Sequence, residues 1–136
     1  MIRARFFVAG TPAPQGSKNI YRGRPVESAK GWKAWRVAVE AEAYNCSLVD
    51  RSAPITGALR LDCTFFFKKP KRPAHPYPPI DTDKLTRCVG DALQKSGLIG
   101  NDSQISTLGS IRKRWALDDG LTGAQITLLD DDLGLV

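Results

Sequence analysis

The 136-residue chain is poor in the residues that build thiol and soft-metal chemistry, with one histidine and three cysteines. His75 stands alone in a proline-rich segment, so neither a multi-histidine metal site nor a Cys-His-His cluster can be built around it. A Ser-His-Asp triad would have to use this loop residue, and we do not expect one. Cys46, Cys63 and Cys88 are widely spaced and form no CxxC pair, which predicts reduced, mostly buried thiols.

Long apolar runs and internal repeats are also missing. No stretch approaches the ~20 apolar residues of a transmembrane helix, and the apolar part of "MIRARFFVAG" is too short for a secretory signal. Hydrophobic content of 42% and charged content of 25% are typical of a globular domain. We therefore expect a soluble, cytoplasmic protein without a membrane segment. It should form one domain over residues 1–129, followed by a flexible acidic tail over 130–136.

Charge is unevenly distributed along the chain, whose net charge is +6. Residues 1–80 hold 14 lysines and arginines against 5 aspartates and glutamates, whereas residues 81–136 hold 6 against 9. A basic half of this kind is typical of proteins that bind a polyanion. The acidic half would repel such a partner unless a cation lay on it.

Apolar periodicity predicts four strands and two helices. Strands are expected over 2–9, 59–67, 104–116 and 123–129, and helices from a cap at Ser28 to about residue 45 and over 84–95. Asp83 is the expected N-cap of the second helix, and Gly97 its stop. The segments 10–19 and 68–80 are expected loops. This β-α-β-α-β-β order predicts an α/β (α+β) fold, with one mixed sheet of about four strands and two helices packed on it.

Three aspartates surround the second predicted helix. Asp81 and Asp83 are two residues apart, so their side chains would point the same way in an extended chain. Asp102 follows after the length of a helix and a return loop, which can bring a third carboxylate back to the first two. Such a cluster would suit Mg²⁺ or Mn²⁺. The bound cation would also offset the repulsion between this acidic patch and a polyanion partner. Helix capping and turn formation by the same residues explain the spacing equally simply.

Arg87 lies one helical turn after Asp83, and Asp91 one turn after Arg87. One interpretation is a ladder of i,i+4 salt bridges worth ~0.2–0.5 kcal/mol per pair. The other is that Arg87 projects into the site and holds a phosphate or stabilises its transition-state charge. Spacing leaves both open.

The stretch "IDTDKLTRCVGDALQKSGLIGNDSQI" resembles the signature of the RusA family of Holliday junction resolvases, which are crossover junction endodeoxyribonucleases. That family shows D-x-D-N-L-x-K, then D-A-L, then a loop ending D-D-[SA]-Q before a strand. Asp81 and Asp83 match the first pair, Asp91 opens the D-A-L, and Asp102 begins the "DSQ", at matching intervals. The early "GTPAPQGSKN" is similar to the family's proline-bearing loop. The likeness spans most of the chain, although only about 26 residues are specific.

The resemblance implies a homodimeric, Mg²⁺-dependent endonuclease, with Mn²⁺ able to replace Mg²⁺, that nicks four-way DNA junctions symmetrically in recombination and repair. It implies metal ligation and catalysis by Asp81, Asp83 and Asp102. It places the family's catalytic lysine at Arg87, and it makes Asp91 a supporting partner of that arginine.

Three positions depart from the family pattern: Lys84 replaces Asn, Arg87 replaces Lys, and Asn101 replaces the first Asp of the later pair. Arginine keeps the charge but cannot donate a proton near neutral pH. Two alternatives therefore stand beside the junction resolvase. One is a broader nuclease for flaps or other branched DNA, and the other is a junction-binding protein with weakened catalysis.

Basic residues in two loops are expected to contact DNA phosphates, which give affinity without sequence information. The alternative is that these loops are merely solvated. Tyr77 is expected to be free to stack on bases, whereas the phenylalanines at 65–67 are expected in the core and the tryptophans at 32 and 35 in the core or a dimer interface. The expected DNA-contacting residues are Lys18, Arg22, Arg24, Lys68, Lys69, Lys71, Arg72 and Lys84.

Overall fold

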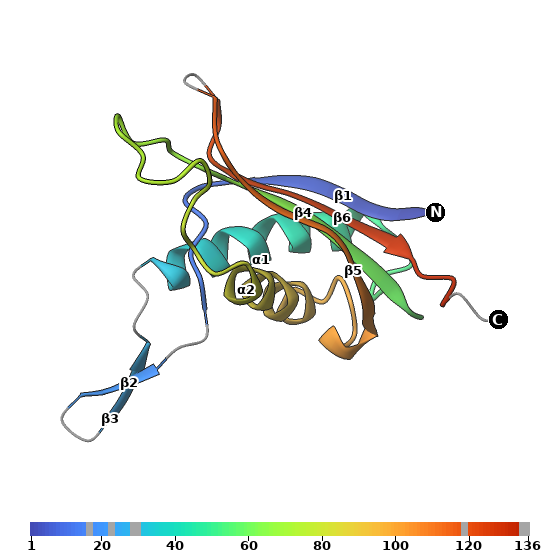
Figure 1. Ribbon diagram of the computed structural model, residues 1–136. Coiled ribbons are helices and arrows are strands. Elements are labelled where there is room, and N and C mark those ends of the chain that lie inside the picture. The colour runs from blue at the N-terminus through green and yellow to red at the C-terminus, as the bar shows by residue number, and fades with distance from the viewer. Residues whose placement is uncertain (16–17, 22–23, 28–30, 118–119, 134–136) are drawn as a thin grey trace.

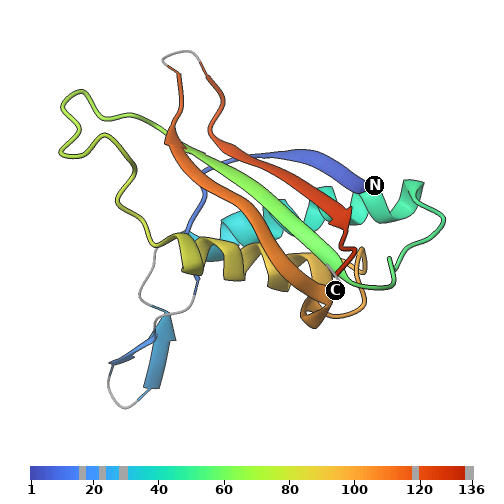
Figure 2. The ribbon, with the colours of Figure 1, turned by 45° about the vertical axis from the view of Figure 1, so that its right-hand side comes forward.

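A four-stranded mixed sheet carries two helices on one of its faces (Figures 1 and 2). The structure is a computed structural model. It describes residues 1–15, 18–21, 24–27, 31–117 and 120–133, and for 18–21 and 24–27 it describes the backbone. The sheet and helix count confirm the predicted fold class. The elements are β1 (Ile2–Ala9), β2 (Lys18–Tyr21), β3 (Arg24–Glu27), α1 (Trp32–Val49), β4 (Leu59–Phe67), α2 (Thr82–Lys95), the 3₁₀ turn η1 (Asp102–Gln104), β5 (Ile105–Trp115) and β6 (Gly123–Asp130).

The strand order β1-β6-β4-β5 puts β1 and β5 at the two edges of the sheet. β6 pairs antiparallel with both of its neighbours, whereas β4 and β5 run parallel. Parallel neighbours cannot be joined by a tight turn, so the chain crosses over through α2. This crossover places both ends of α2, and the aspartates near them, at the edge of the sheet that β5 forms.

The core lies between the sheet and the helices. Every second residue of β4, from Leu59 to Phe67, is buried, and α2 buries an apolar stripe that includes Leu85, Val89 and Leu93. Trp35 of α1 is 2% exposed. Because side chains alternate across a strand, the intervening strand residues point to the opposite face, which no described segment covers (Figures 1 and 2).

Helix boundaries differ from the sequence-based expectation at two caps. α1 begins after Gly31, and Ser28, the expected cap, lies outside the described residues. α2 begins two residues earlier than expected, so its cap is Asp81 and not Asp83. Gly97 is confirmed as the stop, since its φ of 85° suits glycine at the position after the helix.

A short antiparallel hairpin, β2–β3, lies partly within the segment expected to be a loop. Each of its strands has four residues, too few to show an alternating pattern, and prolines and glycines surround them. It stands apart from the main sheet, beyond the N-terminal end of α1 (Figure 1).

The cysteines are free thiols, as predicted, and Cys63 and Cys88 are buried while Cys46 is half-buried. Burial raises the pKa of Cys88 to about 12 and raises the pKa of Cys63 further. Burial, with the nearby Glu42 carboxylate, also raises the pKa of Cys46. All three therefore stay protonated at neutral pH and serve as small apolar side chains.

The start of the expected acidic tail is bonded to the sheet. Asp130 is the last residue of β6 and pairs with Arg3 at 3.0 Å. Asp131 accepts hydrogen bonds from the hydroxyls of Ser106 and Thr107 at 2.6 and 2.7 Å, which lower its pKa. Among the described helices, none has the length and apolar character needed to cross a membrane.

Candidate active site along α2

Asp81 and Asp83 lie together at the N-terminus of α2. Asp81 has an extended backbone and caps the helix, with its Oδ1 accepting a hydrogen bond from the Asp83 backbone N at 3.0 Å. Asp83 is in the first turn, where the helix dipole favours negative charge, and its side chain is 78% exposed. Asp83 is already helical, so the shared extended geometry expected for the pair does not apply. Two carboxylates nevertheless meet solvent at this helix end.

Arg87 is one turn further along the same face. Its Nη2 lies 3.6 Å from Oδ2 of Asp83, and the Arg87 side chain is 52% exposed. An exposed i,i+4 pair of this kind contributes only ~0.3–0.5 kcal/mol to stability. The guanidinium therefore remains accessible to a second anion, such as a phosphate, without a large cost to the fold.

Asp91, the other expected partner of Arg87, is instead hydrogen-bonded to the loop that follows β1. Its Oδ2 accepts a hydrogen bond from Nε2 of Gln15 at 3.0 Å. The backbone N of Gln15 also donates to the carbonyl of Lys84 at 3.3 Å. One residue of the loop after β1 thus clamps two turns of α2. Sequence reasoning assigned Gln15 no role, because neither contact is local in sequence.

Asp102 opens η1 and lies against the middle of α2. A Cβ placed on Gly90 would be 3.9 Å from the Asp102 Cβ, and the Asp102 backbone N donates to Oε1 of Gln94 at 2.9 Å. Asp83, Arg87, Gly90 and Gln94 are spaced by three or four residues and so share one helix face. The structure therefore brings Asp102 to the face of α2 that carries Asp83 and Arg87.

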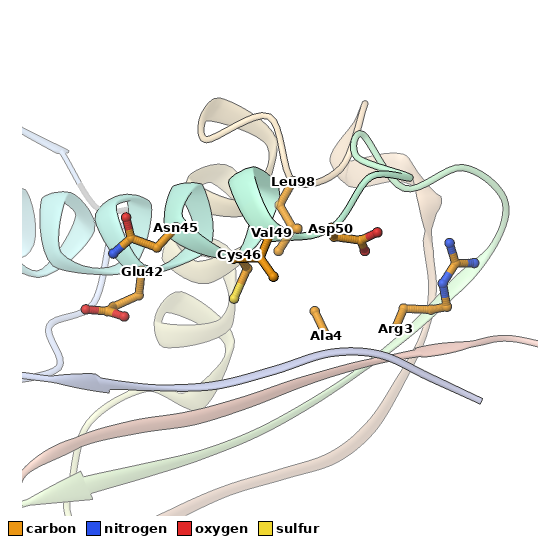
Figure 3. A pocket seen from close by; sticks show the side chains of 8 residues that line it. All are labelled: Arg3, Ala4, Glu42, Asn45, Cys46, Val49, Asp50 and Leu98. Carbon is orange, nitrogen blue, oxygen red and sulfur yellow. The ribbon is translucent and has the colours of Figure 1, made fainter.

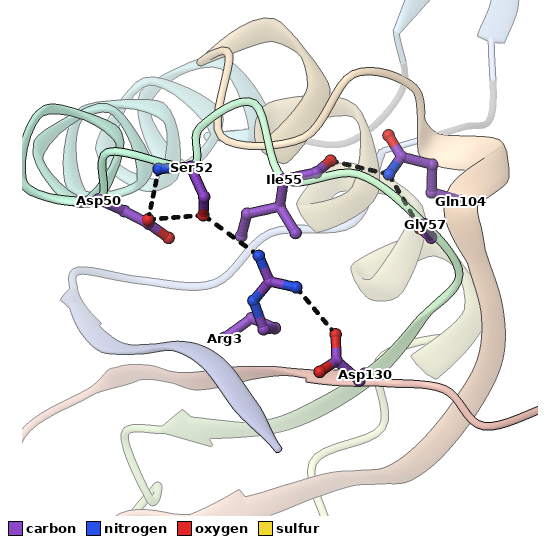
Figure 4. Close-up of polar contacts among 7 residues, drawn as sticks. All are labelled: Arg3, Asp50, Ser52, Ile55, Gly57, Gln104 and Asp130. Carbon is purple, nitrogen blue, oxygen red and sulfur yellow. Dashed lines mark hydrogen bonds and ion pairs between the residues drawn. The ribbon is translucent and has the colours of Figure 1, made fainter.

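Gln104 fixes the turn that presents Asp102. Its Oε1 accepts hydrogen bonds from the backbone N of Gly100 and of Asn101 at 2.8 and 2.9 Å. Its Nε2 donates to the carbonyls of Ile55 and Gly57 at 2.9 and 3.0 Å (Figure 4). Asn101 completes a capping box by accepting from the Ser103 backbone N at 2.8 Å. These hydrogen bonds close the turn and also attach it to the segment before β4.

The three aspartates do not meet at one point. Within the described residues, no three histidine, cysteine, aspartate or glutamate side chains form a group able to hold a metal ion. Gly90, beside Asp102, is seven residues beyond Asp83, or ~10 Å along the helix axis. This arrangement does not fit one ion held by all three aspartates. Asp81 and Asp83 do have the donor chemistry for Mg²⁺, which is often bound by one or two carboxylates together with waters and substrate phosphates.

Lys113 of the edge strand β5 holds the chain just before Asp81. Its Nζ donates to the carbonyl of Ile80 at 2.7 Å and lies 5.4 Å from the centre of the Tyr77 ring. Two residues on, Nε1 of Trp115 donates to the carbonyl of His75 at 3.1 Å. The proline-rich loop is thus fastened to β5 at two points. The alternation in "IRKRW" was a usable signal, because it places Lys113 on the half-buried face.

The expected DNA-contacting residues lie in three places. Those of the proline-rich loop are all exposed. Lys84 is half-buried in the first turn of α2. Arg22 lies outside the described residues, and the backbone of Lys18 and Arg24 is placed in β2 and β3. The exposed loop residues are Lys68, Lys69, Lys71 and Arg72.

The aromatic residues divide as the strand alternation requires. Phe65 and Phe67 are in the core, as expected, whereas Phe66 is half-buried on the uncovered face of the sheet. Tyr77 is 48% exposed, and its ring stacks on His75 with centroids 5.2 Å apart. One face of Tyr77 is therefore already occupied before any base could stack on it.

A separate cavity of about 400 Å³ lies between β1 and the C-terminal part of α1 (Figure 3). None of the expected site residues lines it. Close by, Arg3 joins Asp130 to the Ser52 hydroxyl, which in turn donates to Asp50 (Figure 4). These contacts fasten β1 to the end of β6 and to the loop after α1. The lining residues are Arg3, Ala4, Glu42, Asn45, Cys46, Val49, Asp50 and Leu98.

A scan against protein-family models finds no match to this chain. A search of curated proteins finds no match either.

Proposed function

We propose that this protein is a Mg²⁺-dependent, structure-selective endonuclease that resolves four-way DNA junctions in recombination or repair, with Mn²⁺ able to replace Mg²⁺. The observation that carries the proposal is the grouping at the start of α2. Two exposed carboxylates, Asp81 and Asp83, stand beside an exposed guanidinium, Arg87. An exposed basic loop leads directly into them. The resemblance of this stretch to the RusA signature points to the same chemistry.

Each group has a defined task in phosphodiester hydrolysis. A bound Mg²⁺ would supply an activated water and stabilise the leaving oxygen. Asp81 and Asp83 would hold that ion at the helix end, with Asp102 further along the same face, close to the path of the DNA strand. Arg87 would bind the scissile phosphate and stabilise the extra negative charge of its transition state. Stabilising this charge requires a cation but no proton transfer, so arginine is suited to the task.

The proline-rich loop would hold the DNA backbone beside the site. Lys68, Lys69, Lys71 and Arg72 are exposed and can each approach a phosphate. Lys113 anchors the end of this loop next to Asp81. Binding of the loop to DNA and placement of the carboxylates would therefore be linked through β5, which holds the loop at Lys113 and Trp115.

Paired symmetric cuts require two active sites, so we propose a homodimer. An exposed apolar stripe on α1 supports self-association: Val37, Tyr44 and Leu48 are 62%, 51% and 66% exposed and recur at helical spacing. Such a stripe is typical of a surface that another protein covers. Light scattering at micromolar protein should give twice the chain mass, and a monomer that still makes paired cuts would contradict the dimer.

A second candidate, a junction-binding protein without cleavage, is favoured by one observation. Asp102 lies ~10 Å along α2 from Asp83, so the three-carboxylate cluster expected for catalysis is not assembled among the described residues. The basic loop would serve either protein equally well.

The deciding experiment incubates a synthetic four-way junction with the protein in Mg²⁺ and in EDTA. We expect symmetric nicks in Mg²⁺, none in EDTA, and none from Asp83→Asn in either buffer. Asp83→Asn should still bind the junction, or bind it more tightly, because it removes negative charge beside DNA. Binding without cleavage by the unmodified protein would establish the second candidate. Full cleavage by Asp83→Asn would refute the assignment of the site.

A further inference from the structure

The face of the sheet opposite the helices carries a set of cations to which the proposed site gives no role. In β1, Phe6 and Val8 are buried, so Arg5 and Phe7 point away from the helices. In β5, Ile111 and Trp115 pack against the core, so Arg112 and Arg114 point away. All three arginines are exposed. Both ribbon views show this face open (Figures 1 and 2).

Strand register places these residues in successive rows across the sheet. One row runs from Phe7 through Gln125 and Thr64 to Arg112. The next, towards the C-terminal end of β4, runs from Gly123 through Phe66 to Arg114. Arg5 stands one row to the other side, on the opposite edge strand. With ~4.8 Å between neighbouring strands, the arginines span roughly 14 Å across the sheet. This spread suits an extended polyanion better than one small anion.

The positive charge of this face is not cancelled locally. Among the described strand residues that point this way, Asp62 is the one carboxylate, and it pairs with Arg60 at 3.0 Å. Asp62 also accepts a hydrogen bond from the Ser110 backbone N at 2.8 Å. Arg5, Arg112 and Arg114 make no ion pair within the described part of the chain. Three guanidiniums therefore remain as net charge.

Two phenylalanines form an apolar floor between the arginines. A Cβ on Gly123 would lie 3.0 Å from Cζ of Phe7, so the end of the Phe7 ring lies over Gly123, which pairs with Phe66 of β4. Both rings are half-buried. Aromatic rings flanked by arginines are a common surface for nucleic-acid strands, where phosphates meet the cations and unpaired bases or sugars meet the rings.

A second copy of this chain is a poorer occupant of the same face. A two-fold contact would bring the three guanidiniums of each copy against like charges, which costs free energy. The apolar stripe of α1, on the helix side of the molecule, has the composition that a contact between copies requires. Charge complementarity therefore favours a nucleic acid on the uncovered face.

We infer that this face, through Arg5, Arg112 and Arg114, binds a second arm of the branched DNA whose first arm lies along α2. The inference rests on the proposed function and adds a physical source of selectivity. Lys113 points to the helix side and anchors the segment beside Asp81, while its neighbours Arg112 and Arg114 point to the other side. A straight duplex cannot lie on both sides of the sheet at once, whereas two arms that diverge from a junction can.

The test measures binding of the full chain, in EDTA, to a four-way junction and to a linear duplex with the same number of base pairs. Kd is determined over a series of KCl concentrations. The variant Arg5→Ala/Arg112→Ala/Arg114→Ala should reduce the slope of log K against log[KCl] for the junction by up to ~0.9 per lost phosphate contact. The slope for the duplex should change no more than it does in the control.

The matched control is Lys33→Ala/Arg36→Ala/Arg51→Ala, which removes the same charge from α1 and the loop after it, outside both α2 and the uncovered face. A second variant, with lysine at the three arginine positions, should restore most of the junction slope because phosphate contacts need charge. Thermal unfolding of each variant shows that the fold is retained.

Each other outcome overturns the inference in an identifiable way. A junction slope equal to that of the control means that the face does not touch DNA. Equal losses for junction and duplex mean that it contacts the same arm as α2. Conversion of a dimer to a monomer by the three alanines identifies the face as a contact between copies. If the unmodified protein binds neither DNA, the proposed function itself fails, and the inference fails with it.

Discussion

The two ends of α2 present their aspartates by different means. Beyond the C-terminal end, the chain turns back so that Asp102 lies against the middle of the helix, in a turn that Gln104 joins to four backbone groups. At the N-terminal end, Asp81 follows thirteen residues of irregular chain that β5 fastens at two points, through Lys113 and Trp115. Asp102 is therefore held by hydrogen bonds within the fold, whereas the placement of Asp81 depends on two long side chains, those of Lys113 and Trp115.

The two regions are therefore expected to have different roles, one mainly in stability and the other mainly in DNA cleavage. A turn with many backbone hydrogen bonds has one geometry, and its loss costs stability. A basic loop held at two points can adjust to a DNA backbone while it keeps the adjoining carboxylates in place. We therefore expect changes near Asp81 to affect DNA cleavage more than folding, and changes near Asp102 to affect folding as well.

The largest effect is expected at Arg87, between the two ends. Arg87→Ala should lower the single-turnover cleavage rate by on the order of 10²–10³, the scale for losing one transition-state donor. It should change the free energy of unfolding by less than ~0.5 kcal/mol, because its ion pair with Asp83 is exposed and 3.6 Å long. Arg87→Lys, the control, should keep most of the rate. A normal rate for Arg87→Ala would leave it only a structural pairing with Asp83.

Gln104→Ala tests the end of α2 that carries Asp102. It removes four hydrogen bonds to backbone groups, and we expect a loss of about 2–3 kcal/mol in the free energy of unfolding. Urea denaturation measures it. The control is Ser103→Ala, because Ser103 is exposed and contributes its backbone N to the turn. If both variants were equally stable, the turn would not depend on the Gln104 side chain.

Lys113→Met tests the other end. It removes the hydrogen bond to the Ile80 carbonyl and the contact with the Tyr77 ring, so we expect a loss of about 1–2 kcal/mol. Cleavage should fall more than stability suggests, because Asp81 loses its anchor. Arg112→Met is the matched stability control on the other face of the same strand. Unchanged cleavage by a folded Lys113→Met protein would show that Asp81 is positioned without the Lys113 contact.

The smallest effect is a pH dependence close to the Asp102 turn. Hydrogen bonds from Ser106 and Thr107 hold the pKa of Asp131 below its usual value. A carboxyl whose pKa is lower in the folded state stabilises the fold above its unfolded pKa of ~3.9. That contribution is lost as pH falls through the folded pKa. Ser106→Ala should therefore lower the unfolding midpoint slightly at pH 7, and the difference should shrink as the pH falls below the usual carboxyl range. A difference that does not change with pH would exclude the Asp131 carboxylate as its source and would point to the contact between Ser106 and the Leu59 carbonyl.

The sequence by itself determined the elements whose patterns are local. Period-2 alternation located β1 and β4 at their observed bounds, and the apolar stripe of α2 with Gly97 beyond it gave the second helix and its stop. Burial of a strand or helix face depends on residues two to four positions apart, so one segment contains the whole signal. The four-residue strands of β2 and β3 escaped because they are too short to show a period.

Contacts between distant segments were decided only by the tertiary structure. The parallel pairing of β4 with β5 put Lys113 beside Ile80 and sent Arg112 and Arg114 to the uncovered face. The crossover through α2 laid Asp102 against Gly90 and not beside Asp81. Spacing along the chain limits how far apart two residues can be, but it does not specify which groups meet. Which groups meet is decided when the strands pair and the helix packs, because those contacts bury the most surface. The polar side chains then lie wherever the packed strands and helix place them.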